Sequence, residues 1–466
     1  MSVVVILAAF QSETSPLIRQ VYMFKLPRVA VGTVQPAADV VPMVWALSSL
    51  FERSGLHVQV YQSKARFGKR DGGHTICGLT ARHLDSWLMS PELCHETFVH
   101  GSRGADLALV LGQYQPGHCG PSAGGDLDTL CAWLDLPQLV VIDVTQLRDC
   151  QILQLPADTA GLLLDRVART ELPRWQTILE PLAGVPVLGA LPRMDAERAM
   201  IEGFAAGDSP SRCLCEVLAG RLTETLQLRQ LFGVMQCAAL PHANGAHFQA
   251  GTKLAGLRVA VAYDEAFHCY FPDVLDLLEL QGALVRDFSP LRDETLPAKT
   301  DIVYFGCGHP HRFAQALAAN QCLALALRNH VCRGRRLYAE GGGLAYLCRY
   351  LHMPSGERLP MAGVMPAIAD YTGDDPAPEP TEITVSRDSW LAPRGAKLRG
   401  YCNSTWEIRP AGPLVSHSGR PGRPADLVAH QQALGGRLQL NFAAQPDFLR
   451  RFSAAGVDPA RSTLVQ

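Results

Sequence analysis

The stretch Tyr338–Leu347 reads YAEGGGLAYL and combines three local signals within ten residues. A β-favouring start leads into three successive glycines, and helix-favouring residues follow them. A strand, an abrupt glycine turn and a helix form the element that exposes a nucleophile at the edge of an α/β sheet. Here the residue at the turn is Gly341, which carries no side chain. The stretch therefore predicts an α/β fold with a nucleophile turn that lacks its nucleophile.

The backbone of this turn is expected to bend sharply between a strand ending near Glu340 and a helix beginning near Leu344. Residues at such turns are held in a strained conformation, usually at positive φ. Glycine adopts this conformation without steric cost. Loss of the nucleophile would thus relieve strain at Gly341.

Working outward, short β-rich runs alternate with helical or turn-rich segments. The first four runs are PRVAVGT (27–33), LHVQVYQ (56–62), ADLALVLG (105–112) and PQLVVIDV (137–144). A second series contains LRVAVAYDEAF (257–267), a helical VLDLLELQGA (274–283), DIVYFGCG (301–308), a helix through 312–330, and RRLYAEGGG (335–343). Such alternation predicts mostly parallel sheets with helices on both faces.

The second series also begins with a strand, which implies a second domain. The segment LPHANGAHFQAGTK (240–253) is weakly periodic and contains glycine, histidine and proline, as linkers do. We predict domains at 23–240 and 257–453, joined by a linker at 241–256. Residues 1–22 form an extension whose role the sequence does not reveal, since Met23 is a second plausible start. Residues 454–466 form a tail.

Composition excludes several classes of protein. The 466 residues are 47% hydrophobic and 18% charged, with a formal net charge of -2, so nothing indicates nucleic-acid binding. The apolar start MSVVVILAAF is too short to span a bilayer. The fourteen cysteines are scattered without CxxC pairs, which favours reduced thiols in a cytoplasmic protein.

Five blocks in order resemble the cobyrinate a,c-diamide synthase family. They are LDSWLMSPELCHETFVHGSRGADLALVLG (84–112), VAVAYDEAFHCYFPDVLDLLELQGA (259–283), YFGCGHPHRFAQALAANQ (304–321), YAEGGGLAYL, and LQLNFAAQPDFLRRF (438–452). The resemblance covers most of residues 23–453. It implies an N-terminal ATP-dependent amidoligase domain with a P-loop-like, dethiobiotin-synthetase-like parallel sheet. The C-terminal domain would be a class I glutamine amidotransferase with a flavodoxin-like fold.

The family's ATP-binding residues are replaced in this chain. Where the family has a G-T-x-x-x-x-G-K-T phosphate loop, residues 32–40 read GTVQPAADV. Gly32 and Thr33 match, but Ala38, Asp39 and Val40 stand at the later glycine, lysine and threonine. A phosphate loop needs that lysine on the phosphates and that hydroxyl on Mg²⁺. Asp39 reverses the charge, and a carboxylate about 4 Å from a phosphate charge costs about 4 kcal/mol at an effective dielectric of 20.

The carboxylates that hold Mg²⁺ in the family are also replaced. KARFGKR (64–70) stands at the family's G-P-D-x-I-D-P segment and places Arg66 and Lys69 where acids belong. Leu111 stands at the acid of the V-E-G strand. Because hard cations require oxygen ligands, we predict that the chain binds neither ATP nor Mg²⁺ and uses no cofactor.

The glutaminase residues of the family are replaced in the same way. Gly341 stands at the nucleophile, and RGYCNSTWE (399–407) puts Tyr401 and Ser404 at the histidines of G-H-E-F-H-Y-S. The H-L-H of the tail becomes Gln439, Leu440 and Asn441. We therefore predict no catalytic residues, since removing the nucleophile of a hydrolytic triad alone costs about a million-fold in rate. Cys307 and Cys348 are expected to be small buried hydrophobes rather than substitute nucleophiles.

Two groups of residues are retained as candidate substrate ligands. Asp85, Ser86, Trp87 and Ser90 resemble the family's acceptor-binding block, although Ser90 before Pro91 also has the pattern of a helix N-cap. Asp264, His268 and Tyr270 follow a predicted strand end, where α/β sheets bind ligands. Phe267 and Phe271 are expected in the core. No metal site is expected, since no H-x-x-x-H helix or nearby acid supports the histidines at 74, 83, 95, 100 and 118.

Three functions remain open. The first is a catalytically degenerate homologue that binds a corrinoid or siroheme-type tetrapyrrole, or regulates an active amidase or another protein of that pathway. The second is an active ATP- and glutamine-dependent amidation of a tetrapyrrole carboxylate. The third is a structural or interaction module that binds no tetrapyrrole. A homodimer is compatible with each.

Overall fold

The computed structural model describes residues 24–68, 80–116, 124–147, 153–204, 208–240, 247–374, 376–413, 415–416, 426–445 and 451. The chain divides into two compact units. The first unit contains Met1–Ala65 and Arg70–His247, and the second contains Arg66–Lys69 and Phe248–Gln466. The extension 1–22, the linker residues 241–246 and the tail 454–466 lie outside the described residues.

The first unit is built on a seven-stranded sheet with the order β3-β2-β4-β1-β5-β6-β7. All its strand pairs are parallel. The strands are β1 (Arg28–Thr33), β2 (Val58–Gln62), β3 (Arg82–His83), β4 (Leu107–Gln113), β5 (Gln138–Asp143), β6 (Thr159–Asp165) and β7 (Val187–Ala190). The central β1 is buried along its whole length, as expected for a strand covered on both faces.

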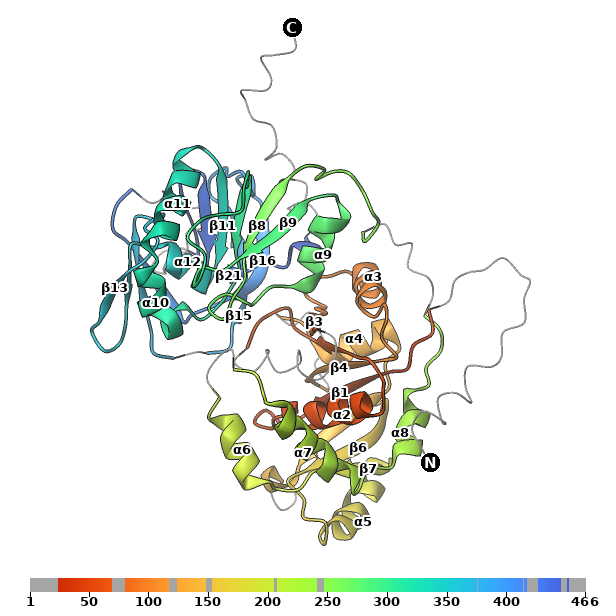
Figure 1. Ribbon diagram of the computed structural model, residues 1–466. Helices are drawn as coiled ribbons and strands as arrows, with labels where there is room; N and C mark the ends of the chain where they lie inside the picture. Colours follow the sequence, from red (N-terminus) through yellow and green to blue (C-terminus); the bar gives the residue numbers. More distant parts are fainter. Residues whose placement is uncertain are drawn as a thin grey trace, which may run out of the picture. The chain divides into compact units, whose positions relative to one another are not determined.

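Helices cover both faces of this sheet. They are α2 (Val41–Arg53), α3 (Pro91–Gly101), α4 (Leu127–Leu134), α5 (Leu172–Ala183), α6 (Asp195–Glu202), α7 (Arg212–Thr223) and α8 (Leu228–Met235), with a 3-10 turn η2 (Val144–Gln146). On one face α2, α7 and α8 share a core with Val58 and Val60, and α2 lies beside α7 (Figure 1). Tyr61 points to the opposite face because side chains alternate along a strand. There its ring lies 5.1 Å from that of Phe98 on α3.

The second unit contains a seven-stranded sheet with the order β18-β19-β20-β11-β10-β8-β9. The run from β20 to β9 is parallel, and β18 and β19 are antiparallel additions at one edge. The strands are β8 (Arg258–Ala262), β9 (Leu284–Phe288), β10 (Ile302–Phe305), β11 (Arg336–Glu340), β18 (Val415–Ser416), β19 (Leu427–His430) and β20 (Ala433–Gly436). The predicted α/β fold in two parts is confirmed.

The helices of the second unit are short. They are α9 (Pro272–Leu280), α10 (Ala314–Ala319), α11 (Gln321–Cys332) and α12 (Gly342–Leu347), with 3-10 turns η3 (Pro310–Phe313) and η4 (Phe442–Ala444). The prediction of one helix through 312–330 is wrong, because the chain breaks at Asn320. The Asn320 side chain caps α11 by accepting from the Leu323 amide and donates to the carbonyls of Pro290 and Asp293.

Two small sheets of the second unit were not predicted. One has the order β13-β12-β14-β17, from β12 (Tyr350–His352), β13 (Arg358–Pro360), β14 (Ala367–Tyr371) and β17 (Trp406–Pro410). The other has the order β15-β16-β21, from β15 (Glu379–Thr384), β16 (Lys397–Cys402) and β21 (Leu438–Gln439). Among the helices of the described ranges, none combines the length and apolar character that crossing a membrane requires.

Candidate functional site

In the first unit, the side chain of Gln35 ties the loop that follows β1 to the end of β5. The amide of Gln35 makes two hydrogen bonds to the backbone at the end of β5. Its Nε2 donates to the carbonyl of Asp143 (3.1 Å), and its Oε1 accepts from the Asp143 amide (2.8 Å). The backbone amide of Gln35 also donates to Oγ1 of Thr33 (3.1 Å). Gln35 is buried, so these bonds fix the loop where a phosphate would otherwise be expected.

The N-terminus of α2 carries a carboxylate at the point where a phosphate loop receives its anion. Oδ1 of Asp39 accepts a hydrogen bond from the amide of Val41 (3.1 Å). The N-cap residue Val40 offers no side-chain bond of its own. Helix N-termini attract anions through unsatisfied amides and the helix dipole. Here Asp39 supplies that negative charge from within the chain.

The space beside Gly32 is filled by large side chains. A Cβ on Gly32 would lie 2.7 Å from atoms of both Leu127 and Tyr114. The Tyr114 hydroxyl donates to the carbonyls of Ala30 and Leu139, each at 3.3 Å. Leu111, which the resemblance places at the family's acid, is 3% exposed in the core. The end of β1 is therefore packed with apolar groups.

The acceptor-block residues Asp85 and Ser86 are engaged in local hydrogen bonds. Asp85 is fully buried, and its carboxylate accepts from the amides of Ala65 (2.8 Å), Trp87 (2.9 Å) and Leu88 (3.1 Å). Ser86 Oγ accepts from the amide of Asp126 (3.0 Å). The Trp87 side chain is half-buried. These contacts give Asp85 and Ser86 a structural role, whether or not a ligand also meets them.

Ser90 is the N-cap of α3, as its pattern allowed. Its side chain accepts from the amide of Leu93 (3.2 Å), and Pro91 occupies the first helical position. Of the histidines considered in the sequence, His83 lies on β3, and His95 and His100 lie on α3. His74 and His118 lie outside the described residues.

Replacing the Ser90 cap is expected to destabilise the first unit modestly. The Ser90→Ala variant should lose about 1 kcal/mol of unfolding free energy, because the Leu93 amide loses its acceptor. The Ser90→Asp variant should retain the stability, since aspartate caps equally well. Chemical denaturation monitored by circular dichroism measures both. Equal stability of Ser90→Ala and the parent chain would contradict the capping role.

In the second unit, Gly341 forms the sharp turn between β11 and α12. Its φ is 47° and its ψ is -113°, so the expected positive φ is confirmed. Its amide donates to the carbonyl of Gly436 on β20 (2.8 Å). The helix begins at Gly342 rather than near Leu344, because the three glycines include the first residues of α12. The turn has the geometry that presents a nucleophile, at a residue without one.

The thiol of Cys307 lies where a side chain at position 341 would extend. A Cβ built on Gly341 would be 3.1 Å from the Cys307 sulfur and 3.7 Å from Nδ2 of Asn403. Burial raises the pKa of the Cys307 thiol well above its usual value, and the nearby Glu340 and Cys269 raise it further. Cys348 is also buried, and burial raises its pKa. Because the thiolate is the nucleophile, neither thiol is activated for attack.

Glu340, the last residue of β11, is a buried carboxyl group next to the turn. Its Oε1 accepts from the Tyr338 hydroxyl (2.9 Å) and from the amide of Leu440 (3.3 Å). Desolvation raises the pKa of Glu340 to about 8, against the lowering effect of these hydrogen bonds. The carboxyl group is therefore largely protonated at neutral pH.

The side chains that the resemblance places at the family's histidines are hydroxyls and amides. Tyr401 on β16 is fully buried and pairs with Gln439 on β21. Oδ1 of Asn441 accepts from the amides of Ala443 (3.0 Å) and Ala444 (3.3 Å) and so begins η4. Ser404 is exposed in the turn between β16 and β17. An amide or an unassisted hydroxyl does not accept a proton from a thiol near neutral pH.

Asp264 and Tyr270 hold the loop that follows β8. The Asp264 carboxylate accepts from the amides of Ala266 (2.9 Å) and Phe267 (3.1 Å), and also from Ser289 Oγ and the Leu291 amide. The Tyr270 hydroxyl accepts from the amide of Gly306 (2.9 Å) and donates to the carbonyl of Ala262. Phe267 and Phe271 are buried, as predicted. His268, the third candidate of this group, is only half-buried.

Sequence reasoning missed Asn403 and His309 as parts of this region, and it gave Glu340 and Cys269 no role beyond their place in the motifs. Asn403 lies nearer to the turn at Gly341 than the exposed Ser404 does. Cys269 and His309 are far apart in the chain but follow β8 and β10, which are neighbours in the sheet. The signal that was available is that both residues come just after predicted parallel strands, whose carboxyl ends share one edge.

Several known proteins are similar to this chain in sequence. Residues 258–404 match the CobB/CobQ-like glutamine amidotransferase domain family. The cobyrinate a,c-diamide synthase of Salmonella typhimurium is 29% identical over 439 residues, which cover 88% of this chain and 94% of that protein. The hydrogenobyrinate a,c-diamide synthase of Streptomyces coelicolor is 28% identical, with 92% and 97% covered. A glutamine amidotransferase crystal structure aligns with 43% of this chain and 99% of its own at 18% identity and a TM-score of 0.34. The chain is a homologue of the cobyrinate a,c-diamide synthases over most of its length.

Proposed function

We propose that this chain is a catalytically degenerate homologue of cobyrinate a,c-diamide synthase that acts as a binding or regulatory subunit in tetrapyrrole amidation. Its homology to these synthases supports a place in a tetrapyrrole-amidation family. The observation that carries the proposal is the turn at Gly341, which keeps the nucleophile geometry without a nucleophile. A fold retained without its reactive group is suited to binding rather than to hydrolysis.

The electrostatics around Gly341 support the loss of glutamine hydrolysis. The chemistry needs a thiolate, an adjacent base and backbone amides for the oxyanion. The nearest thiol, Cys307, stays protonated because burial and Glu340 raise its pKa. The amide of Gly306, in the loop that follows β10, donates to the hydroxyl of Tyr270. The region thus stabilises its own loops instead of a reacting carbonyl.

The loop after β1 supports the loss of ATP use. Gln35 ties the loop to β5, and Asp39 places a carboxylate at the N-terminus of α2. A nucleotide phosphate would have to displace these internal bonds and then face a negative charge. We infer that the chain works without a nucleotide or Mg²⁺.

The proposed partner is an active amidase, or another protein of the tetrapyrrole pathway, that supplies the chemistry this chain lacks. The proposed ligand is a tetrapyrrole carboxylate. Of the retained candidates, Asp85, Asp264 and Tyr270 are buried in local hydrogen bonds. Trp87 and His268 are only half-buried and are therefore the better placed of the candidates to meet a ligand.

The proposal can be tested by isothermal titration of the chain with cobyrinate, with Mg–ATP and with glutamine in three separate experiments. Cobyrinate should bind, whereas Mg–ATP and glutamine should produce no heat beyond dilution. The Salmonella typhimurium relative serves as a control under the same conditions. Binding of all three ligands by this chain would favour active amidation instead. Binding of none would favour a structural or interaction module, and either result would overturn the proposal.

Millimolar Mg–ATP is expected to leave the melting temperature of this chain unchanged. A ligand stabilises a protein only by binding its native state, and gives about 2.7 kcal/mol at a hundred times its Kd. The measurement is a thermal shift with and without Mg²⁺. The Asp39→Asn variant is a matched control that removes the carboxylate but not the bonds of Gln35. A magnesium-dependent rise in the parent chain would show that the loop accepts a nucleotide after all.

A further inference from the structure

The carboxyl ends of β8 and β10 meet at the point where the chain reverses its direction across the second sheet. The chain runs from β8 to the edge strand β9 and then returns to place β10 on the other side of β8. Ligands of open α/β sheets bind in the crevice at such a reversal of strand order. Residues 268–269 follow β8, and residue 309 follows β10.

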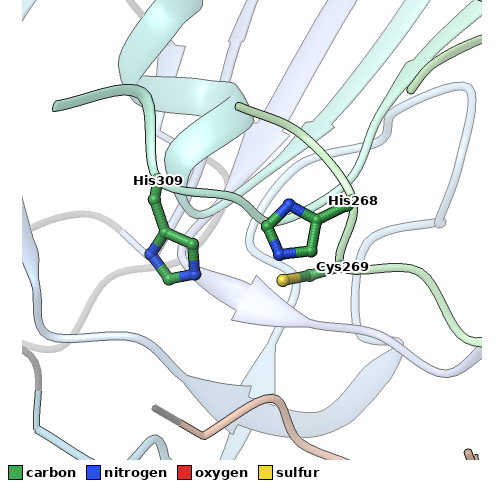
Figure 2. A group of neighbouring side chains, drawn as sticks. All are labelled: His268, Cys269 and His309. Atoms are coloured by element: carbon green, nitrogen blue, oxygen red, sulfur yellow. The ribbon is translucent and has the colours of Figure 1, made fainter. Parts of the chain in front are cut away.

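Three soft metal-ligating side chains converge at this point. The ligand atoms of His268, Cys269 and His309 all lie within 4.8 Å of one another. Figure 2 shows one ring nitrogen of each imidazole turned toward the sulfur of Cys269. The two imidazole rings have centroids 5.7 Å apart, so they flank the thiol without stacking on each other.

The backbone holds these three residues in place. The amide of Cys269 donates to the carbonyl of Cys307 (3.2 Å), and the amide of His309 donates to the carbonyl of Ala266 (2.9 Å). A Cβ at Gly308 would lie 2.1 Å from the oxygen of Ala266, so only glycine allows the two loops to approach this closely. The ligand-bearing loops are therefore tied to each other directly.

The environment of His268 suits a metal ligand. The His268 imidazole is half-buried, and its ligand atom lies within 4.8 Å of those of Cys269 and His309. Its Nδ1 is buried and makes no hydrogen bond of ordinary geometry within the described residues. A bound ion is one explanation for a buried ring nitrogen that lacks a hydrogen-bond partner within the described residues.

We propose that His268, Cys269 and His309 form a binding site for a transition metal ion of the zinc class. Zn²⁺ takes sulfur at about 2.3 Å and imidazole nitrogen at about 2.0–2.1 Å. Ligand atoms around such an ion lie roughly 3.3–3.8 Å apart, so side-chain rotations within the present loops close the site. Three protein ligands leave a fourth position for water or a partner's side chain.

The ligand set also distinguishes this ion from the Mg²⁺ of the family. Mg²⁺ and Ca²⁺ take oxygen ligands, whereas one thiolate and two imidazoles select a softer ion. The site lies in the second unit and needs neither a nucleotide nor glutamine. His268 is also a candidate contact of the tetrapyrrole, but zinc binding is measured without a tetrapyrrole, so either proposal can fail alone.

Competition with a chromophoric zinc chelator tests the site on the full chain without a histidine tag. The parent chain should take up one Zn²⁺, with proton release as the Cys269 thiol deprotonates. Cys269→Ser should lower the affinity by more than the 10–100-fold that loss of an outer-shell partner costs. Cys322→Ser, which changes an exposed thiol on α11, should leave the affinity unchanged.

The absorption spectrum of bound Co²⁺ reports the ligands independently of affinity. The parent chain should show a thiolate-to-cobalt charge-transfer band and the intense visible bands of a tetrahedral site. Cys322→Ser should retain the charge-transfer band, and Cys269→Ser should lose it. His309→Gln changes a half-buried side chain and should weaken binding while the fold is retained. A parent spectrum without the thiolate band, or unchanged zinc affinity in Cys269→Ser, would overturn the proposal.

Discussion

Replacing Glu340 by glutamine is expected to stabilise the second unit strongly at pH 8 and to have little effect at pH 4. Burial raises the pKa of Glu340 to about 8 in the folded chain, from an unfolded value near 4.5. At a pH between these two pKa values, Glu340 keeps its proton in the native state and releases it on unfolding. The stability present below pH 4.5 is therefore lost progressively as the pH rises toward 8.

The size of the effect follows from the pKa difference. Each pKa unit corresponds to about 1.4 kcal/mol of unfolding free energy. Removing the carboxyl group is therefore expected to raise the unfolding free energy by on the order of 4 kcal/mol at pH 8. Glutamine keeps an oxygen to accept from the Tyr338 hydroxyl and the Leu440 amide, so those bonds need not be lost. Denaturant unfolding of the parent chain and of Glu340→Gln across this pH range measures the difference.

A control of opposite sign is available on the surface of the same unit. Hydrogen bonds from Arg399 and Lys397 lower the pKa of Glu382. Glu382→Gln should therefore destabilise the chain slightly at neutral pH, and this difference should vanish as the pH falls through the lowered pKa. If Glu340→Gln instead proved less stable than the parent at pH 8, the native state must stabilise an ionised Glu340.

Restoring a cysteine at position 341 is expected to destabilise the second unit without restoring glutaminase activity. Positive φ at a residue other than glycine costs about 1 kcal/mol or more. The structure adds a second cost, because the new Cβ would lie 3.1 Å from the Cys307 sulfur. The Gly341→Cys variant should therefore lose more stability than the backbone conformation alone requires.

Activity should stay absent because the new thiol would have no base beside it. Gln439 and Asn441 are amides, and Ser404 is an exposed hydroxyl. Ammonia release from glutamine and labelling by an electrophilic glutamine analogue measure activity, under reducing conditions because Cys307 is adjacent. Cys307→Gly in the same chain should recover stability and still give no activity. Labelling together with ammonia release would show that a base survives, and would contradict the proposed degeneracy.

The parallel strands were predictable because their sequences are nearly continuous apolar runs. β1, β4 and β5 fit this pattern, since strands buried on both faces need no polar alternation, and β2 coincides with a predicted run although it contains Gln59 and Gln62. Periodicity could not locate the small sheets, whose strands are short and partly exposed. It also could not find the break at Asn320, which depends on bonds to Pro290 and Asp293 elsewhere in the fold.

For the candidate site, the sequence predicted which residues follow a strand or a turn, but not which side chains meet. The chain itself placed Gly341 at a turn and His268 after a strand. That Cys307 lies against Gly341, or that His309 faces Cys269, depends on which strands become neighbours and how the side chains turn. Those facts arise from sheet order, since residues 269 and 309 meet through the adjacency of β8 and β10.

We expect the paired hydrogen bonds between Gln35 and Asp143 to order the loop after β1 before any ligand binds. A phosphate-binding loop commonly gains part of its order from its ligand, so that conformational entropy is lost on binding. In this chain the buried side-chain amide of Gln35 bonds the loop to the end of β5 within the protein itself. We therefore expect the loop to stay ordered whether a nucleotide is added or not.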